Sequence, residues 1–542
     1  MRRRWLILFL LLPGLSVRAG NEDWLEAAVV LTGAASVESL DESAVERFEA
    51  LHGHPVPLNL ASRSRLLSTG LLSAYQVASL ADYRARCGDI LSAEELALVD
   101  GFDPETAYAL SCFVSFRSAT LPGVPVADSL RGRIRQSLEF RTKGPAGKYR
   151  VHFAERAEAG MAWREGLPSF YGVYYGRGRL GKAVAGQFHA RFGQGLVLWT
   201  GFRVEDLLQP ASFDRHAGGI SPSWSYNAGD ALFGAAADFA LGHWDGSVYA
   251  AREGAGANAG YTWRTGRAGL TACWPGYGRV PRLGADVRVN LRGIQLFSEV
   301  ASEPVQGHFA ATGGFIAPMG EHLKAALRLR AVPSSYSHLK YGEYAAAASL
   351  SFTAGEGDRH RGAFLTDFSA LPVPGGDTKR KVLKIKTLWV WKICPSWSLE
   401  TRLGGRLRNY ASERARAEIR TDGNWTDGRW LSRFRLNGDW CDGWGVLSYL
   451  EAGRTRQMLS LYLRGTFFYT EGWASRLYAY ERDAPGNFNV PAYYGRGFAL
   501  TLVGAARKSW RYVTLKTWVR LYYLQKKPGH QTGLSLQLSL TI

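Results

Sequence analysis

One short glycine motif has the residue types and the spacing of a phosphate-binding loop. Gly176-Arg-Gly-Arg-Leu-Gly181 has the letters of a dinucleotide-binding fingerprint, in which glycines let the backbone approach a pyrophosphate. That site also requires a strand–turn–helix unit and an acidic residue about 20 residues further on, and neither is found here. We therefore interpret these glycines as part of a hairpin turn.

The histidine, serine and cysteine residues form no recognisable catalytic or metal-binding motif. Among the eleven histidines, His152 and His189 lie at strand-like positions, and none has metal-ligand spacing. The sequence contains no His-Glu-x-x-His, Gly-x-Ser-x-Gly or Walker motif. The five cysteines are an odd number, so at least one thiol stays free or pairs between chains. We expect no cofactor, no metal and no enzymatic activity. A Ser-His-Asp or Ser-His-Asn hydrolase assembled across barrel strands would escape such a search and stays an alternative.

The first residues indicate export. Arg2, Arg3 and Arg4 precede the apolar run from Trp5 to Leu12, and Val17-Arg18-Ala19 offers a cleavage site, as in a bacterial secretory signal peptide. We expect residues 1–19 to be removed and the mature chain to be released beyond the inner membrane.

Charge is distributed unevenly along the rest of the chain. Residues 20–116 hold 5 basic and 15 acidic residues, a net charge of −10, whereas residues 117–542 hold 57 basic and 32 acidic residues, a net charge of +25. Such an asymmetry marks a domain boundary. Residues 117–129, with two prolines and a glycine, predict a linker between a helical domain at 20–116 and a second domain at 130–542.

Residues 20–116 have the pattern of short capped helices. Reversals at Gly70-Leu-Leu-Ser73 and Gly101-Phe-Asp-Pro104 predict two helix–turn–helix units in tandem within residues 57–116. Helix caps are offered by Asp41 or Ser43, by Ser92 in the capping box Ser92-Ala-Glu-Glu95, and by Asp103 before Pro104.

This region resembles the tandem helix-hairpin-helix repeat of competence-type DNA-binding proteins. The resemblance rests on Pro57-Leu-Asn59, Leu66–Ser73, Tyr83-Arg-Ala-Arg86, Gly88, Leu96 and Val99–Pro104. In that family, backbone amides at each turn hold a nucleic-acid phosphate without reading its sequence. The phosphate or nucleic-acid contacts that the resemblance implies are Gly70, Ser73, Arg84, Arg86 and Gly101.

Two departures from the repeat argue against nucleic-acid binding. Leu72 and Asp103 stand where the resemblance implies the second glycine of each turn, and a carboxylate there would repel phosphate. Nucleic-acid affinity depends on neutralising phosphates, which a region of net charge −10 is poorly placed to do. We expect a periplasmic helical interaction module that has lost most phosphate binding, with a periplasmic protein as its candidate partner. DNA binding or uptake is the alternative.

From residue 130 onward, apolar and polar residues alternate in segments of about 8 to 13 residues. In the last segment the even-numbered residues from Leu534 to Ile542 are apolar, and the odd-numbered ones from Ser535 to Thr541 are polar. Tyrosine and tryptophan recur near segment ends, where membrane barrels have aromatic girdles. The sequence thus predicts a mainly β fold, a large antiparallel transmembrane β-barrel of about 18 to 24 strands preceded by a small all-α domain. The export signal and the lack of a blade-length repeat disfavour a soluble sandwich or propeller.

A second resemblance concerns large outer-membrane proteins that carry an N-terminal helix-hairpin-helix module. It rests on Tyr174-Tyr-Gly-Arg-Gly178 and on Phe188–Gly201, and Tyr494-Gly-Arg-Gly497 is similar to the first of these. It implies an architecture more than an activity.

If the apolar residues face lipid, the alternating cations face the barrel lumen. We expect many to pair with carboxylates such as Glu139, Glu299 and Glu400, yet the excess of +25 predicts a positive potential that attracts anions. The predicted function is non-enzymatic: binding or passing an anionic ligand, such as DNA or another polyanion, across the outer membrane, or serving as an envelope assembly component. The expected partners also include outer-membrane lipid and the barrel assembly machinery. The candidate lumen cations are Arg133, Arg135, Arg328, Arg330, Lys384, Lys386, Arg402, Arg406, Lys516 and Arg520.

Overall fold

The computed structural model describes most of the chain from Asp23 to Ile542. The expected signal peptide at residues 1–19, most of the expected linker and the candidate Arg133 lie outside the described residues. No helix among the described residues is long and apolar enough to cross a membrane. The described residues are 23–34, 36–118, 134–141, 146–153, 156–164, 168–176, 178–203, 206–215, 217–226, 229–276, 278–336, 342–371, 380–410, 413–456, 458–485, 487–510, 513–526 and 529–542.

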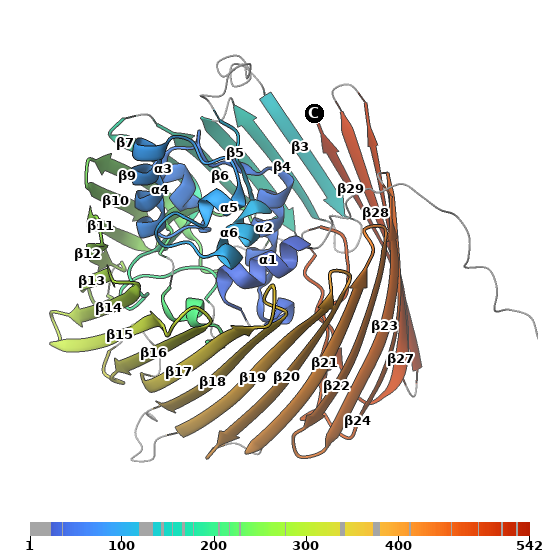
Figure 1. The fold of residues 1–542 in the computed structure, drawn as a ribbon. Coiled ribbons are helices and arrows are strands. Elements are labelled where there is room, and N and C mark those ends of the chain that lie inside the picture. The colour runs from blue at the N-terminus through green and yellow to red at the C-terminus, as the bar shows by residue number, and fades with distance from the viewer. Residues whose placement is uncertain are drawn as a thin grey trace, which may run out of the picture.

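A closed antiparallel barrel forms most of the structure (Figure 1). Within the described residues it has 24 strands: β3 (Ile134–Arg141), β4 (Ala146–Phe153), β5 (Ala157–Arg164), β6 (Ser169–Tyr175), β7 (Leu180–Arg191), β9 (Leu232–Leu241), β10 (Trp244–Ala251), β11 (Gly254–Trp263), β12 (Gly266–Trp274), β13 (Arg282–Leu291), β14 (Ile294–Glu303), β15 (His308–Pro318), β16 (Leu323–Val332), β17 (Glu343–Ala354), β18 (His360–Leu371), β19 (Arg380–Cys394), β20 (Trp397–Arg408), β21 (Ala415–Thr426), β22 (Trp430–Trp440), β23 (Trp444–Thr455), β24 (Leu459–Thr470), β27 (Arg496–Ser509), β28 (Thr514–Lys526) and β29 (Gly529–Thr541). Pairing of β29 with β3 closes the ring, and β8 (Gly219–Pro222) is an additional short strand beside β7. The predicted fold class is confirmed.

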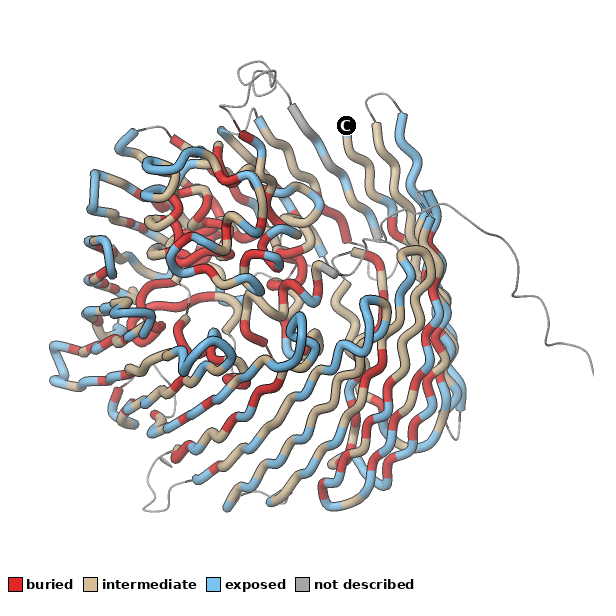
Figure 2. Tube along the Cα trace, viewed as in Figure 1, coloured by how far each residue is buried: buried red, intermediate tan, exposed pale blue. Residues whose placement is uncertain are grey.

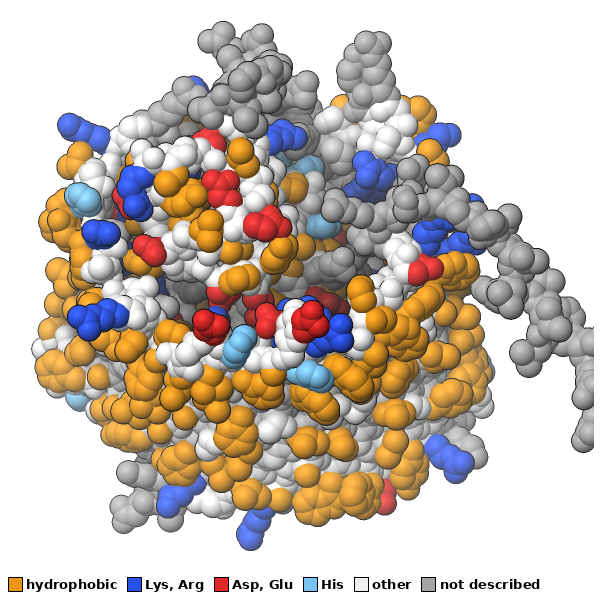
Figure 3. All heavy atoms as spheres, in the orientation of Figure 1, with side chains coloured by type: hydrophobic (Ala, Val, Ile, Leu, Met, Phe, Trp, Pro, Cys, Tyr) orange, Lys and Arg blue, Asp and Glu red, His pale blue; other side chains and the backbone are white. Residues whose placement is uncertain are grey.

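The outer wall of the barrel is apolar because its strands alternate. On β29, Leu534 is 65% exposed while Gln537 is 2% exposed, and on β23 the neighbours Leu450 and Glu451 are 61% and 1% exposed. Figure 3 shows apolar side chains over the outer wall. An alternation of this kind, apolar outward and polar inward, is what a barrel in a lipid bilayer presents.

Short helices precede the barrel. In chain order these are α1 (Asp23–Thr32), the 3-10 turn η1 (Val37–Ser39), α2 (Glu42–Gly53), α3 (Arg63–Ser68), α4 (Ala74–Cys87), α5 (Ala93–Leu96) and α6 (Pro104–Ser111), and β1 (Val56–Pro57) pairs in parallel with β2 (Val114–Ser115).

The helix starts agree with the sequence prediction, with one difference. Asp41 caps α2 by accepting the N–H of Ala44 at 2.6 Å, and Asp103 caps α6. Ser92 caps α5, but Glu95 accepts the N–H of Leu91 at 2.8 Å, one residue before the position that a capping box predicts.

The helical region, residues 23–118, lies inside the barrel (Figure 1). Its apolar core is completed by Phe202, Tyr480 and Phe488, which come from two loops of the barrel. Figure 2 shows buried residues gathered where the helices meet the barrel wall. The sequence predicted a helical domain joined to the barrel by a linker, most of which lies outside the described residues; the described helices pack against the inner wall. Two kinds of contact hold them there: ion pairs of their carboxylates with wall cations, and apolar packing against residues of the two loops.

Candidate functional site in the barrel lumen

A first loop between β7 and β9 folds into the lumen; its described residues are 192–203, 206–215, 217–226 and 229–231. Glu299 on β14 holds its first turn by accepting the N–H groups of Gln194 at 2.6 Å, Leu196 at 3.0 Å and Val197 at 3.3 Å. This turn contains the Phe192–Gly201 segment on which the second resemblance rests, and residues 192–200 are buried. The 3-10 turn η2 (Pro210–Phe213) follows in the same loop.

A second loop, described over residues 471–485 and 487–495, folds inward between β24 and β27. In it β25 (Leu477–Tyr478) pairs with β26 (Ala492–Tyr493). Its Glu481 is 1% exposed and accepts hydrogen bonds from Arg520 of β28 and from Tyr493. Arg482 donates to Glu451 of β23 at 2.7 Å. Buried ion pairs therefore fix this loop to the inner wall.

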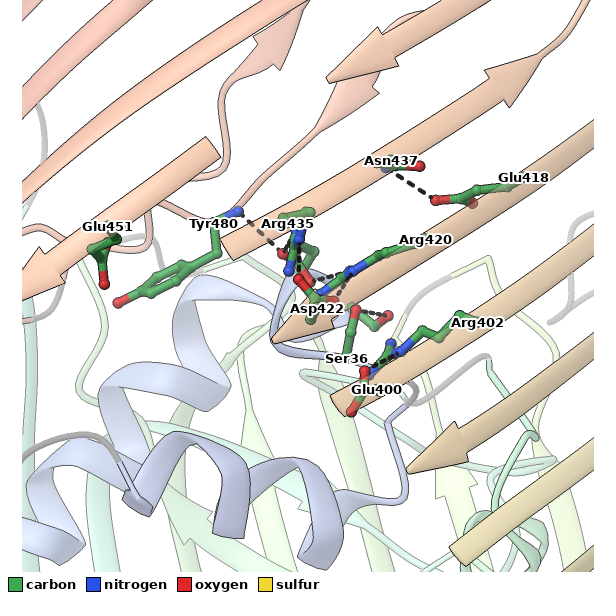
Figure 4. A network of polar contacts seen from close by, with 12 residues as sticks. Ser36, Glu400, Arg402, Glu418, Arg420, Asp422, Arg435, Asn437, Glu451 and Tyr480 are labelled. Atoms are coloured by element: carbon green, nitrogen blue, oxygen red, sulfur yellow. Dashed lines mark hydrogen bonds and ion pairs between the residues drawn. The ribbon is translucent and has the colours of Figure 1, made fainter. Parts of the chain in front are cut away.

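One anchor of the helical region is the carboxylate of Glu38 in η1, whose side chain is 11% exposed. Its two oxygens accept from Arg435 at 2.6 Å and from Arg420 at 3.0 Å, and the N–H of Tyr480 donates to it at 3.2 Å. Asp422 bridges the same two arginines. Figure 4 shows Arg420, Asp422 and Arg435 on neighbouring strands with Tyr480 beside them. This cluster joins the helices, the barrel wall and the second loop.

Electrostatics keep Glu38 ionised in this position. Burial by itself would raise the pKa of Glu38, but the attraction of Arg420 and Arg435 holds that pKa well below its usual range. The carboxylate side chain is 11% exposed, so solvent screens these interactions little.

Carboxylates of other helices meet wall cations around the barrel. Glu46 pairs with Lys148 of β4 at 2.9 Å, and both side chains are 4% exposed. The remaining pairs lie nearer to solvent: Glu42 with Arg164 at 3.5 Å, Glu26 with Arg433 at 3.6 Å, Glu105 with Arg361 at 2.6 Å, and Asp103 with Lys324. The pair of Arg63 of α3 with Asp245 of β10, at 3.5 Å, has the reverse polarity.

Most of the candidate lumen cations have carboxylate partners. Arg328 and Lys516 alternate with apolar outward residues and so lie on inward positions, whereas Arg135 lies on β3 and nothing of its side chain is described. The pairs are Arg330 with Glu343 at 3.0 Å, Lys384 with Asp367 at 3.4 Å, Lys386 with Asp206 at 2.5 Å, Arg402 with Glu400 at 2.5 Å, Arg406 with Glu413 at 3.4 Å, and Arg520 with Glu481.

The candidate phosphate contacts differ in their burial and in their partners within the chain. Gly70 has a positive φ of 67° and lies against Arg47 of α2, and Ser73 is buried and caps α4. Arg84 lies 3.7 Å from Asp89, and Arg86 pairs with Asp82 at 2.7 Å. Gly101 is exposed in the second turn, and its carbonyl accepts from Gln76. The phosphate-binding role of these five residues stays a prediction.

The two histidines at strand-like positions have structural partners. His152 pairs with Glu158 at 3.3 Å, and Nδ1 of His189 lies 3.2 Å from Oγ1 of Thr200. Gly176 and Gly178 lie in the turn between β6 and β7, as the sequence predicts. Among the described residues, no three His, Cys, Asp or Glu side chains lie close enough together to hold a metal ion.

Sequence reasoning missed the residues that anchor the helical region, above all Glu38, Glu46, Arg420 and Arg435. The signal was present in the opposite charges of residues 20–116 and 117–542. That contrast predicts attraction between the two parts, although it does not show which carboxylate meets which cation.

No protein-family model matches the chain, and no curated protein matches it. Several solved structures are similar to it at low identity. The translocation pore of the P pilus usher PapC is 9% identical, with 76% of this chain and 99% of that chain covered and a TM-score of 0.37. The FrpB iron transporter from Neisseria meningitidis is 9% identical, with 76% and 82% covered and a TM-score of 0.31. OccAB4 of Acinetobacter baumannii is 8% identical, with 76% and 98% covered and a TM-score of 0.29.

Proposed function

We propose that the protein is an outer-membrane β-barrel whose own N-terminal helices close the lumen, and that displacing them opens a path for an anionic ligand. The observation that carries this proposal is the position of Glu38 between Arg420 and Arg435, in the middle of the inner wall. A barrel of 22 strands already has room for a plugging domain, and this one has 24 in its described residues.

The outer wall supports the membrane location. Apolar residues alternate outward, and exposed tryptophans such as Trp244, Trp274 and Trp444 lie at strand ends, where lipid headgroups meet water. The turns on the side of β3's first residue are short, for example 242–243 and 264–265, whereas the opposite side carries the loops 192–231 and 471–495. In bacterial barrels the short turns face the periplasm.

The class of ligand is inferred from the wall cations that would lose their carboxylate partners if the helices were displaced. Displacement of the helices removes Glu38 and Glu46 from the wall. It leaves Lys148 without this partner, and Arg420 and Arg435 with Asp422 as their shared carboxylate. Buried cations that lose a carboxylate are costly unless another anion replaces it. An anionic ligand would therefore compete with the helices for the same cations.

Conductance of the purified full-length protein in planar bilayers tests this function. We expect low conductance for the native protein and a larger, anion-selective conductance for Glu38→Gln. Glu105→Gln is the matched control, because the pair of Glu105 with Arg361 is largely exposed and contributes little. A native protein as conductive as Glu38→Gln would contradict the plug, and a cation-selective Glu38→Gln would contradict the anionic ligand.

DNA binding by the helical region is the second candidate, and the placement of its residues disfavours it. The first turn, at Gly70, is half-buried against Arg47, and Arg86 is paired with Asp82. If the helices nevertheless bind DNA, the full-length protein should retain duplex DNA at low salt, and Arg84→Glu should weaken that binding.

A further inference from the structure

Two arginines from different parts of the fold approach the first turn of the helical region, at Gly70. Arg47 belongs to α2, and Arg191 is the last residue of β7. A Cβ built on Gly70 would lie 2.9 Å from Nη1 of Arg47 and 3.9 Å from Nη1 of Arg191. The two guanidiniums therefore converge on one point, where the helical region contacts the barrel wall.

Neither arginine forms an ion pair with a carboxylate of the described residues. Arg191 is 6% exposed and its Nε donates to a backbone carbonyl at 2.8 Å, but no acceptor of the described residues lies within hydrogen-bonding distance of its two Nη groups. Nε of Arg47 is buried without a hydrogen bond. Asp41 and Asp230 attract Arg191 only from a distance, since Asp41 caps α2 and Asp230 accepts the N–H of Gly201 at 2.6 Å. A buried guanidinium without a counter-charge is costly, and these two also repel each other.

Arg191 also lines a cavity between α3, the first inward loop and the strands β9 to β13. The lining contains four arginines and three aspartates. The other three arginines each have an aspartate partner, and each lining aspartate has a cation partner: Arg63 and Arg267 with Asp245, Arg267 with Asp286, Arg288 with Asp214, and Lys182 with Asp238. Within the described part of the chain, Arg191 is thus the lining cation that lacks a carboxylate.

The cavity extends to the turn that Arg47 approaches. Gly218 lines the cavity, and a Cβ built on it would lie 3.6 Å from Cα of Gly70. A solute in the cavity beside Arg191 would therefore also lie near the positive charge of Arg47.

The donors that this site offers are side-chain groups. At the turn itself, the N–H of Gly70 donates to the carbonyl of Leu67 at 3.0 Å, and the N–H of Leu71 donates to Oγ1 of Thr69 at 3.1 Å. These two backbone amides are already used within the turn. The planar guanidinium binds oxyanions such as phosphate through parallel N–H···O hydrogen bonds, which a spherical anion such as chloride cannot accept in the same way.

We propose that Arg191 and Arg47 bind a small oxyanion such as inorganic phosphate in this cavity while the helices stay docked. The anion would neutralise the buried guanidinium of Arg191, and Arg47 adds a second positive charge. Because Arg47 lies in the helical region and Arg191 in the wall, a bound anion joins the two parts and stabilises the docked state. The site does not require the helices to leave the lumen, so it does not depend on the proposed opening.

Equilibrium dialysis of the full-length protein in detergent micelles against labelled inorganic phosphate tests the site. About 0.15 M chloride in the buffer screens weak binding to surface charges. We expect a single saturable site, and binding that is weaker by about tenfold or more in Arg191→Met and in Arg47→Met, because each variant removes a charged donor. Arg86→Met is the matched control. It removes an exposed arginine of the same helical region that pairs with Asp82, and it should bind phosphate as the native protein does.

Thermal unfolding supplies a second measurement. Excess phosphate should raise the Tm of the native protein and leave that of Arg191→Met unchanged, because a ligand stabilises only the state that binds it. In phosphate-free buffer, Arg191→Met should unfold at no lower a temperature than the native protein, since the variant removes a buried charge that has no counter-charge.

Four results would overturn the inference. The first is a native protein that binds no phosphate saturably, and the second is equal affinity of Arg191→Met and the native protein. The third is equal weakening by Arg86→Met and Arg191→Met, which would show adsorption to surface charge. The fourth is a lower Tm of Arg191→Met in phosphate-free buffer, which would show that the chain itself already satisfies Arg191. None of these measurements depends on conductance, so the proposed plug and this site can fail separately.

Discussion

Oε1 of Glu38 accepts a hydrogen bond from Nη1 of Arg435 at 2.6 Å, although the two residues are 397 positions apart in the chain. The contact places a carboxylate of the helical region against a guanidinium in the middle of β22. Because Arg420 approaches the other oxygen, the pair forms part of a buried cluster rather than a surface ion pair. The docking of the helices depends on this cluster more than on the exposed pairs nearer the rim.

The lowered pKa of Glu38 predicts a specific pH dependence. A carboxyl whose pKa is lower in the folded state stabilises that state above its ordinary pKa, about 4.3, and this stabilisation is lost as the pH falls through the lowered value. Native helices should become sensitive to protease in micelles only at strongly acidic pH. Glu38→Gln should show this sensitivity already at neutral pH, with a loss of about 3 kcal/mol. Equal sensitivity of both proteins at neutral pH would contradict the anchoring role.

Because Glu46 and Lys148 form a buried pair, we expect the stability losses of their single variants not to add in the double variant. Burial raises the pKa of Glu46, and Lys148 only partly offsets this, so ionised Glu46 needs its partner. Lys148→Met should destabilise the protein by about 3 to 5 kcal/mol at neutral pH because it leaves a buried carboxylate unpaired. The double variant Glu46→Leu with Lys148→Met should recover most of that loss. Thermal unfolding in detergent measures the cycle, and additive losses would show that the two side chains do not interact.

Gly33 lies where the helical region contacts the first inward loop, and we expect no room there for a larger residue. Gly33 has a φ of 69°, and a Cβ built there would lie 2.6 Å from Cβ of Ser212 in η2. Gly33→Ala should therefore cost about 1 to 3 kcal/mol from backbone strain and overpacking. Gly53 serves as the control because a Cβ there meets no atom within 4 Å. Thermal unfolding of both variants should show a loss for Gly33→Ala alone.

We expect that removing the guanidinium of Arg520 releases the second inward loop from the wall. Arg520→Met leaves Glu481 buried without its guanidinium partner, so residues 471–495 should detach from β28 while the barrel stays closed. Trypsin should then cut the loop after Arg482, whose side chain is 5% exposed and paired with Glu451 in the native protein. Lys508→Met, on the exposed end of β27, is the control and should leave the loop protected. Cleavage at equal rates in all three proteins would contradict this.

The sequence by itself determined the barrel. Strict alternation, as from Leu534 to Ile542, sorts apolar side chains to one face of a strand, and a chain of such strands can bury its edges only by closing. Local signals also determined the starts of helices at Asp41 and Asp103, because a cap involves residues within one helical turn.

Only the tertiary structure decided where the helices lie and which charges meet. The pairing of Glu38 with Arg435 joins residues whose separation in the chain gives no local pattern, and the same holds for Glu46 with Lys148. Opposite net charges of the two parts predict attraction at long range, but a buried ion pair also needs the exact approach of two side chains. The distance between the two side chains of such a pair depends on where the closed barrel of 24 described strands places each of them. No single strand determines that position.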